Sequence, residues 1–133
     1  MPAPHALIVE DELVVALYLQ DLLSRHGYVS FSFAAAAAQA IEQFRLHQPD
    51  LVTIDFGLMH GDGLEAAREL RAIRGNVPIV YVTGSPDAVQ KDLRAVVLEK
   101  PITPRDLAEA LDLLNADRSP RRNDGQAPAA TVI

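Results

Sequence analysis

An acidic residue, Asp55, stands directly after an apolar segment of strand length, residues 51–54. An ionised carboxylate at the end of a buried strand is costly unless a cation, a proton or a hydrogen-bond donor compensates its charge. Other apolar segments end in groups that could surround such a carboxylate. Glu10 and Asp11 follow one of them, and Lys100 follows another. These residue types predict a charged site built from separate parts of the chain.

The same residues suit phosphoryl transfer to a carboxylate. The three carboxylates of Glu10, Asp11 and Asp55, with nearby backbone oxygens, favour Mg²⁺, which binds a few such ligands and several waters. Lys100 would balance the negative charge and hold a phosphoryl oxygen. Thr83, which also ends an apolar segment, could donate a hydrogen bond to another oxygen. Asp55 would then be the nucleophile.

Alternating strand and helix patterns predict how these residues meet. Five apolar segments predict strands, at residues 6–9, 28–33, 51–54, 78–82 and 95–98. Helical spacing predicts helices at 13–26, 34–47, 64–73 and from 103 onward, whereas 85–94 leaves room for only a short or irregular helix. This alternation indicates an α/β fold, a doubly wound parallel sheet with helices on both faces. Such sheets carry functional groups at the carboxyl ends of their strands, so we expect one pocket there.

Composition limits the classes of function. The chain has 133 residues, enough for one domain with a full core, predicted over residues 1–116. Residues 117–133 predict a flexible polar tail that is too short to be an output domain. The net charge of −6 argues against nucleic-acid binding, and no apolar segment is long enough to span a membrane. The absence of cysteine excludes thiol chemistry and fits a cytoplasmic location.

These motifs, in this order, resemble the receiver domains of two-component response regulators over about residues 5–116. The matching positions are the acidic pair Glu10-Asp11, the phosphoacceptor Asp55, Asp62-Gly63 seven and eight residues further on, the switch hydroxyl Thr83, and the pair Lys100-Pro101. The resemblance implies a flavodoxin-like fold with the strand order 2-1-3-4-5. It also implies signalling by protein–protein contact from a stand-alone domain, which we expect to be a monomer or a weak homodimer.

The resemblance implies a mechanism as well. Asp55 would accept a phosphoryl group from a sensor histidine kinase or a histidine phosphotransfer protein, while Lys100 pairs with the acyl phosphate and Thr83 moves toward it. The domain would assist its own phosphorylation and dephosphorylation without being an enzyme.

The resemblance further implies a Mg²⁺ site. The ligands would be Asp11, Asp55 and the backbone carbonyl of Gly57, with Glu10 acting directly or through water.

The sequence departs from the family pattern in three places. Met59 replaces a usual proline, Val97 replaces the aromatic residue that usually couples to the switch threonine, and Thr83 and Lys100 are a few residues closer in sequence than usual. Residues 78–85 are similar to a subclass signature, Pro-Phe-x-Phe-Ala-Thr-Gly-Tyr. Tyr81 within this segment shares a strand face with Thr83, so it is either a core residue or a substitute for the missing ring.

Three alternatives come from other classes of protein. A Mg²⁺-dependent phosphohydrolase of the haloacid-dehalogenase type would need a second aspartate where Gly57 stands, which argues against it. A pseudo-receiver scaffold that does not turn over phosphate would not need the complete set of acids, threonine and lysine, although Val97 leaves room for it. A flavin-binding role would need a phosphate-binding loop after the first strand, where the acidic segment 10–12 would repel phosphate.

Overall fold

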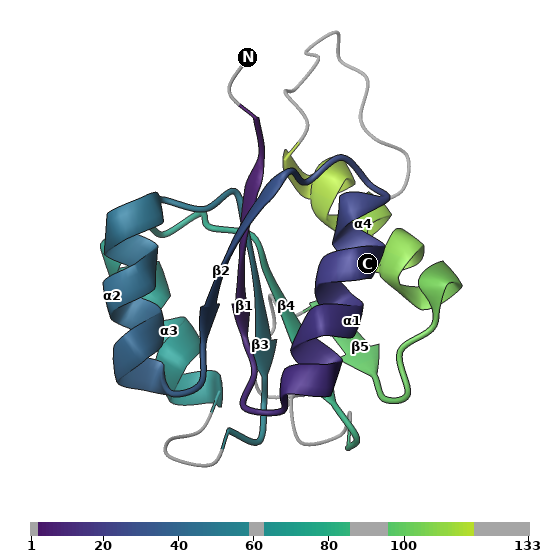
Figure 1. Cartoon of the computed structure of the whole chain (residues 1–133). Helices are drawn as coiled ribbons and strands as arrows, with labels where there is room; N and C mark the ends of the chain where they lie inside the picture. Colours follow the sequence, from purple (N-terminus) through teal and green to yellow (C-terminus); the bar gives the residue numbers. More distant parts are fainter. Residues whose placement is uncertain (1–2, 59–62, 86–95, 119–133) are drawn as a thin grey trace, which may run out of the picture.

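The protein forms a parallel five-stranded sheet with helices on both faces (Figure 1). The computed structural model describes residues 3–58, 63–85 and 96–118. The strands are β1 (His5–Val9), β2 (Ser30–Ala34), β3 (Leu51–Asp55), β4 (Ile79–Thr83) and β5 (Val96–Glu99). Their order in the sheet is β2-β1-β3-β4-β5, which confirms the predicted flavodoxin-like topology.

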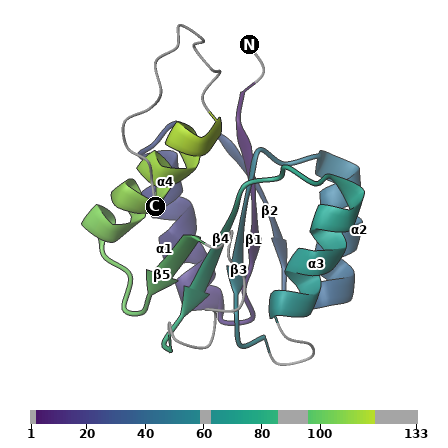
Figure 2. The same ribbon diagram turned by 180° about the vertical axis from the view of Figure 1, so that it is seen from behind.

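The described ranges contain four helices, α1 (Leu13–Ser24), α2 (Ala37–His47), α3 (Gly63–Ile73) and α4 (Pro104–Arg118). Helices α2 and α3 cover one face of the sheet, and α1 and α4 cover the other (Figures 1 and 2). The short or irregular helix predicted at residues 85–94 falls, apart from its first residue, outside the described residues. Most of the predicted tail, residues 119–133, also lies outside them.

Two apolar cores, one on each face of the sheet, hold these layers together. Strands β3 and β4 are buried at every position, which explains their continuously apolar sequences. On the α2/α3 face the core includes Phe44, Leu70 and Tyr81, and on the α1/α4 face it includes Leu19 and Leu107. None of the helices in the described ranges has the length and apolar character needed to cross a membrane.

Local signals in the sequence explain several helix ends. The Thr103 hydroxyl oxygen accepts a hydrogen bond from the Asp106 backbone N–H (3.0 Å), so Thr103 caps the N-terminus of α4. Helix α2 ends at His47, and the following residue, Gln48, has a left-handed φ of 48° and precedes Pro49. After α1 the chain turns at Gly27, whose φ of 97° favours glycine.

Some element bounds in the sequence interpretation are wrong. The strand predicted at 28–33 is β2, Ser30–Ala34. The helix predicted from residue 34 begins at Ala37, because Ala34 continues the sheet: it pairs with Val9, and its carbonyl accepts a hydrogen bond from the Glu10 N–H (2.8 Å). The helical spacing of apolar residues in α1 is confirmed, but Leu13 and Leu17 are 69% and 49% exposed and lie at the surface.

Candidate functional site

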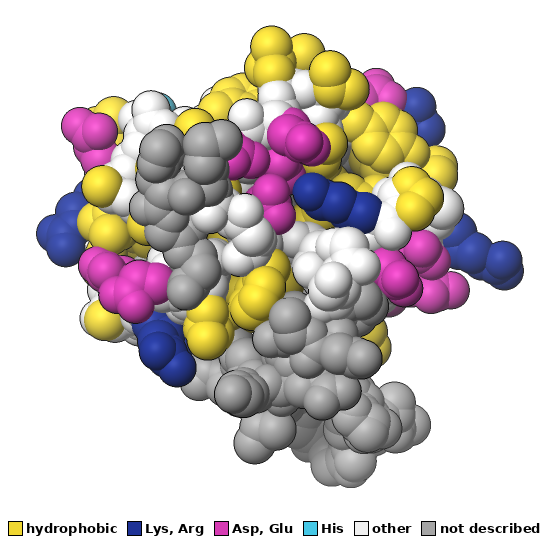
Figure 3. All heavy atoms as spheres, turned by 90° about the horizontal axis from the view of Figure 1, so that it is seen from below, with side chains coloured by type: hydrophobic (Ala, Val, Ile, Leu, Met, Phe, Trp, Pro, Cys, Tyr) yellow, Lys and Arg dark blue, Asp and Glu magenta, His cyan; other side chains and the backbone are white. Residues whose placement is uncertain are grey.

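The carboxyl ends of β1, β3, β4 and β5 lie together at the lower edge of the sheet in Figure 1. Residues at or just after these ends line one pocket. Its volume is about 630 Å³. The residues that line it are Asp11, Glu12, Asp55, Phe56, Gly57, Thr83, Gly84, Ser85 and Lys100. Seen from this side, acidic side chains gather next to a basic one near the middle of the face (Figure 3). Topology thus brings the candidate residues of the sequence together.

Asp55 is the last residue of β3 and is only 7% exposed. Its Oδ1 accepts a hydrogen bond from the Gly57 backbone N–H (3.1 Å). The segment after it is fixed by two backbone bonds, from the Phe56 N–H to the carbonyl of Val82 (2.9 Å) and from the Gly63 N–H to the carbonyl of Phe56 (2.9 Å). The carboxylate is therefore held in one orientation by its own loop.

Lys100 follows β5 and supplies the positive charge of the site. Its backbone N–H donates to the carbonyl of Thr83 (2.8 Å), and its peptide bond to Pro101 is cis. The Lys100 Nζ lies 3.7 Å from Asp55 Oδ2. At this distance the two groups form an ion pair, but they are too far apart for a hydrogen bond. Lys100 therefore balances the charge of Asp55 while leaving Oδ2 without a close donor from this side chain.

Three carboxylates meet at the acidic end of the pocket. Glu10, Asp11 and Asp55 each offer one oxygen, and these oxygens all lie within 4.8 Å of one another. Burial, followed by the negative charge of Asp55, raises the pKa of Glu10 to about 7. Glu10 Oε1 is buried and accepts no hydrogen bond from the described residues. A buried carboxylate oxygen without a donor, within a cluster of acids, fits the all-oxygen ligand set of a divalent cation such as Mg²⁺.

Thr83 ends β4 and is 6% exposed. Its hydroxyl oxygen accepts a hydrogen bond from the Ser85 backbone N–H (2.9 Å). Because this bond uses an oxygen lone pair, the hydroxyl proton can still be donated to a group in the pocket.

The aromatic residue Tyr81 is fully buried in the core on the α2/α3 face. It pairs with Val97 in the β4–β5 ladder, and the Phe56 ring meets its ring edge-on, with centroids 5.8 Å apart and planes at 85°. Its ring thus packs beside the half-buried Val97, where the sequence lacks the usual aromatic residue. Phe56 was not among the candidates from the sequence, although its position directly after Asp55 was a signal.

A steric constraint requires glycine at position 63, and the place of Gly63 in the motif did not reveal this constraint. A Cβ at this position would lie 2.7 Å from the Asp55 carbonyl oxygen and 2.7 Å from the Phe56 Cα. The start of α3 can therefore pack against the end of β3 only without a side chain. Met59 and Asp62, which the sequence interpretation also used, lie outside the described residues.

The sequence matches the family described as response regulator receiver domain over residues 6–112. Because this match covers most of the chain, the chain belongs to that family, the receiver domains of two-component signalling systems. Members of this family are in general signalling domains rather than enzymes. The proposed subclass based on the β4 signature stays a prediction.

Relatives and solved structures agree with this class. The chain is 36% identical over 114 residues to the transcriptional regulatory protein PdtaR of Mycobacterium tuberculosis, covering 82% of this chain and 55% of that protein. It therefore spans about half the length of that relative. It is 29% identical over 108 residues to sporulation initiation phosphotransferase F of Bacillus subtilis, covering 80% of this chain and 86% of that protein. A CheY-like receiver domain structure from Methylobacillus flagellatus has a TM-score of 0.75 at 26% identity, covering 85% and 99% of the two chains.

Proposed function

We propose that this receiver domain is controlled by phosphorylation of Asp55. The observation that carries the proposal is the placement of a buried, oriented carboxylate opposite the Lys100 ammonium at 3.7 Å and beside two further acids. A lysine next to a carboxylate is an ordinary ion pair. A lysine next to three clustered carboxylates, in an open pocket, suits transfer of a phosphoryl group onto one of them.

The two oxygens of Asp55 have different surroundings. Oδ1 accepts the Gly57 N–H, whereas Oδ2 lies nearer Lys100. We therefore assign Oδ2 as the nucleophile. It attacks the phosphorus of a phosphohistidine, the phosphorus–nitrogen bond breaks, and the departing imidazole keeps the electron pair and takes up a proton. Lys100 then pairs with the new acyl phosphate, and the Thr83 hydroxyl donates to one of its oxygens.

Mg²⁺ is the cofactor that the acidic cluster fits. Asp11, Asp55 and the Gly57 carbonyl would hold it, with Glu10 as a direct or water-mediated ligand. When bound, the ion neutralises negative charge on the incoming phosphoryl group. The residues of the chain orient Asp55 through the Gly57 N–H and place the Lys100 ammonium beside it.

The phosphodonor is a sensor histidine kinase or a histidine phosphotransfer protein, met in the cytoplasm. The first turns of α1 directly follow Asp11 and Glu12, which line the pocket. These turns carry an exposed apolar surface formed by Leu13, Val14 and Leu17, with exposures of 69%, 79% and 49%. A donor must bring its phosphohistidine to Asp55, so its surface has to contact this end of the domain. Exposed apolar side chains here supply the area that such a contact buries.

The fate of the phosphoryl group defines two versions of this function. In one, the phosphorylated domain acts on a partner protein by contact. In the other, it passes the group to a second histidine. The relative named as a phosphotransferase, most of whose length the chain covers, supports the second version. Mixing the phosphorylated protein with a histidine phosphotransfer domain distinguishes them, because only the second version returns the group to histidine.

A phosphohydrolase is disfavoured by the position of Gly57. A Cβ at this glycine would lie 3.9 Å from Asp55 Oδ1, so a side chain here would stand beside the carboxylate where a general acid is needed. Glycine supplies no acid. The position thus fits a site that stores a phosphoryl group better than one that rapidly hydrolyses it.

The chemical nature of the product tests the proposal. Phosphoramidate contains a nitrogen–phosphorus bond and imitates phosphohistidine. With Mg²⁺ present, we expect it to label the protein with an acyl phosphate, visible by ³¹P NMR and removed by hydroxylamine. A label that resists hydroxylamine, or that forms equally well in EDTA, contradicts the proposal.

A further inference from the structure

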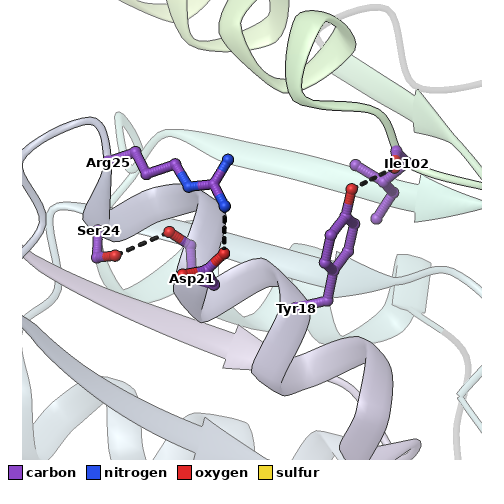
Figure 4. A network of polar contacts seen from close by, with 5 residues as sticks. All are labelled: Tyr18, Asp21, Ser24, Arg25 and Ile102. Carbon is purple, nitrogen blue, oxygen red and sulfur yellow. Dashed lines mark hydrogen bonds and ion pairs between the residues drawn. The ribbon is translucent and has the colours of Figure 1, made fainter.

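A hydrogen bond connects α1 to the segment that carries Lys100. The Tyr18 hydroxyl donates to the Ile102 backbone carbonyl at 3.0 Å, across 84 positions of the sequence (Figure 4). Tyr18 is 39% exposed, whereas Ile102 is 7% exposed and packs in the core on the α1/α4 face. The bond thus joins a partly exposed side chain to the backbone of a well-anchored loop residue.

The loop between β5 and α4 has the lysine at its first position. One end is fixed where the Lys100 N–H donates to the Thr83 carbonyl (2.8 Å). The other end is fixed where Thr103 caps α4 by accepting the Asp106 N–H (3.0 Å). The Tyr18 hydroxyl holds the carbonyl between these two points. This side-chain hydrogen bond ties the loop to α1.

Helix α1 is also the element that directly follows the acids. Glu10 and Asp11 come after β1, and α1 begins at Leu13. Because successive turns of a helix are rigidly connected, the bond from Tyr18 fixes the loop relative to the acidic segment that precedes α1. The hydrogen bond therefore connects the two charged halves of the pocket by a route that does not pass through the sheet.

We propose that Tyr18 is a positioning residue that keeps the Lys100 ammonium within reach of Asp55 Oδ2. This inference rests on the proposed function of the site, and it assigns a role to a side chain that does not line the pocket. The Tyr18 side chain is partly exposed, and its hydroxyl makes the hydrogen bond to the loop. Tyr18→Phe therefore removes the hydrogen bond while keeping the ring.

The test is a double-mutant cycle with Lys100. Initial rates of phosphorylation by phosphoramidate are measured for the wild type, Tyr18→Phe, Lys100→Ala and the double variant. One neutral hydrogen bond corresponds to a rate loss of about 2- to 10-fold for Tyr18→Phe. If Tyr18 acts through Lys100, the same substitution has no effect once Lys100 is alanine. An unchanged rate in Tyr18→Phe, or an equal loss in both backgrounds, overturns the proposal.

Ser24→Ala is the matched control. It removes another hydroxyl from α1, one that donates to the Asp21 carbonyl (2.8 Å) and is not bonded to the loop (Figure 4). We expect the wild-type phosphorylation rate for this variant. A loss as large as that of Tyr18→Phe would show a general effect of hydroxyl removal from α1, and would overturn the specific role of Tyr18.

A second readout separates failure of this inference from failure of the proposed function. In the unphosphorylated protein, the ¹³C resonance of the Asp55 carboxylate responds to the nearby ammonium charge. Lys100→Ala defines the shift when that charge is lost, and we expect Tyr18→Phe to move the resonance part of the way in the same direction. If the wild type accepts no phosphoryl group, the proposed function fails and this measurement alone decides the inference. A resonance that stays at its wild-type position overturns it.

Discussion

The backbone of Asp55 lies in direct contact with Gly63, where a Cβ atom would come within 2.7 Å of the Asp55 carbonyl oxygen. The neighbouring atoms on that side are also fixed, because they are the Phe56 backbone and the Ile54 side chain within β3. The start of α3 thus restrains the backbone of Asp55, and the loop after Asp55 orients its carboxylate through the Gly57 N–H.

Gly63→Ala is expected to displace the end of β3 or the start of α3. This displacement should lower the unfolding free energy by about 2 kcal/mol, as at other overpacked sites. Phosphorylation should slow as well, because Asp55 moves. Gly75→Ala is the control, since a Cβ there meets only the Arg71 carbonyl oxygen, at 3.8 Å. Urea unfolding measures both variants, and equal stabilities would contradict the steric account.

Glu10 should make stability depend on pH in the absence of divalent cations. Burial and the charge of Asp55 raise its pKa from 4.5 to about 7. Between these values the folded protein keeps a proton that the unfolded chain has lost, so the unfolding free energy falls as pH rises from about 4.5 to 7. Glu10→Gln removes this fall. Relative to the wild type, we expect the variant to gain stability at pH 8 compared with pH 5.

His5 also contributes to the pH dependence of stability, so its contribution must be the same in the two proteins being compared. Its pKa is lowered, first by burial and then by the charge of His47, so its contribution to stability is lost as pH falls below about 6.5. The two residues therefore act in opposite directions. Because His5 is present in both proteins, taking the difference between Glu10→Gln and the wild type removes its effect. A difference that is the same at pH 5 and pH 8 would show that Glu10 ionises normally.

Mg²⁺ should stabilise the domain through the acidic cluster. At ten times its Kd, a bound ion adds about 1.4 kcal/mol to the unfolding free energy, which corresponds to a rise in Tm of about 5 °C. Thermal unfolding with Mg²⁺ and with EDTA measures this rise. Asp11→Asn should abolish it, whereas Asp112→Asn, which removes an exposed acid on α4, should leave it intact. A rise that survives Asp11→Asn would place the ion elsewhere.

The edge-on contact between Phe56 and Tyr81 should couple the site energetically to the core. Such ring pairs contribute about 1 kcal/mol beyond the burial of their surface. A double-mutant cycle of Phe56→Leu and Tyr81→Leu, measured by urea unfolding, should therefore give a coupling energy of this size. If the Tyr81 ring takes part in the switch, Tyr81→Leu also weakens the spectral change that accompanies phosphorylation. An additive cycle would mean that the two rings act independently.

The sequence allowed the fold to be predicted because its strands are short, apolar and regularly separated by helical patterns. The candidate site residues at the strand ends could be predicted in the same way. Asp55 and Thr83 each end an apolar run, and Lys100 comes two positions after another. A parallel sheet brings such positions to one edge. The predicted pocket therefore followed from topology together with the types of residue at the strand ends.

Contacts that join distant segments could not be predicted in this way. The bond from Tyr18 to Ile102 depends on how α1 lies on the sheet, and the tight approach of Gly63 depends on where α3 begins. The start of α2 was misplaced for a related reason. Ala34 has a high helix propensity, yet its pairing with Val9 keeps it in the sheet, so tertiary structure overrides the local preference.

The most direct test of the central claim is the mass of the intact protein after incubation with acetyl phosphate or phosphoramidate and Mg²⁺. We predict a gain of one phosphoryl group in the wild type, strongly reduced in Lys100→Ala and absent in Asp55→Asn. No gain in the wild type, or a gain that persists in Asp55→Asn, would contradict the assignment of Asp55 as the phosphoacceptor.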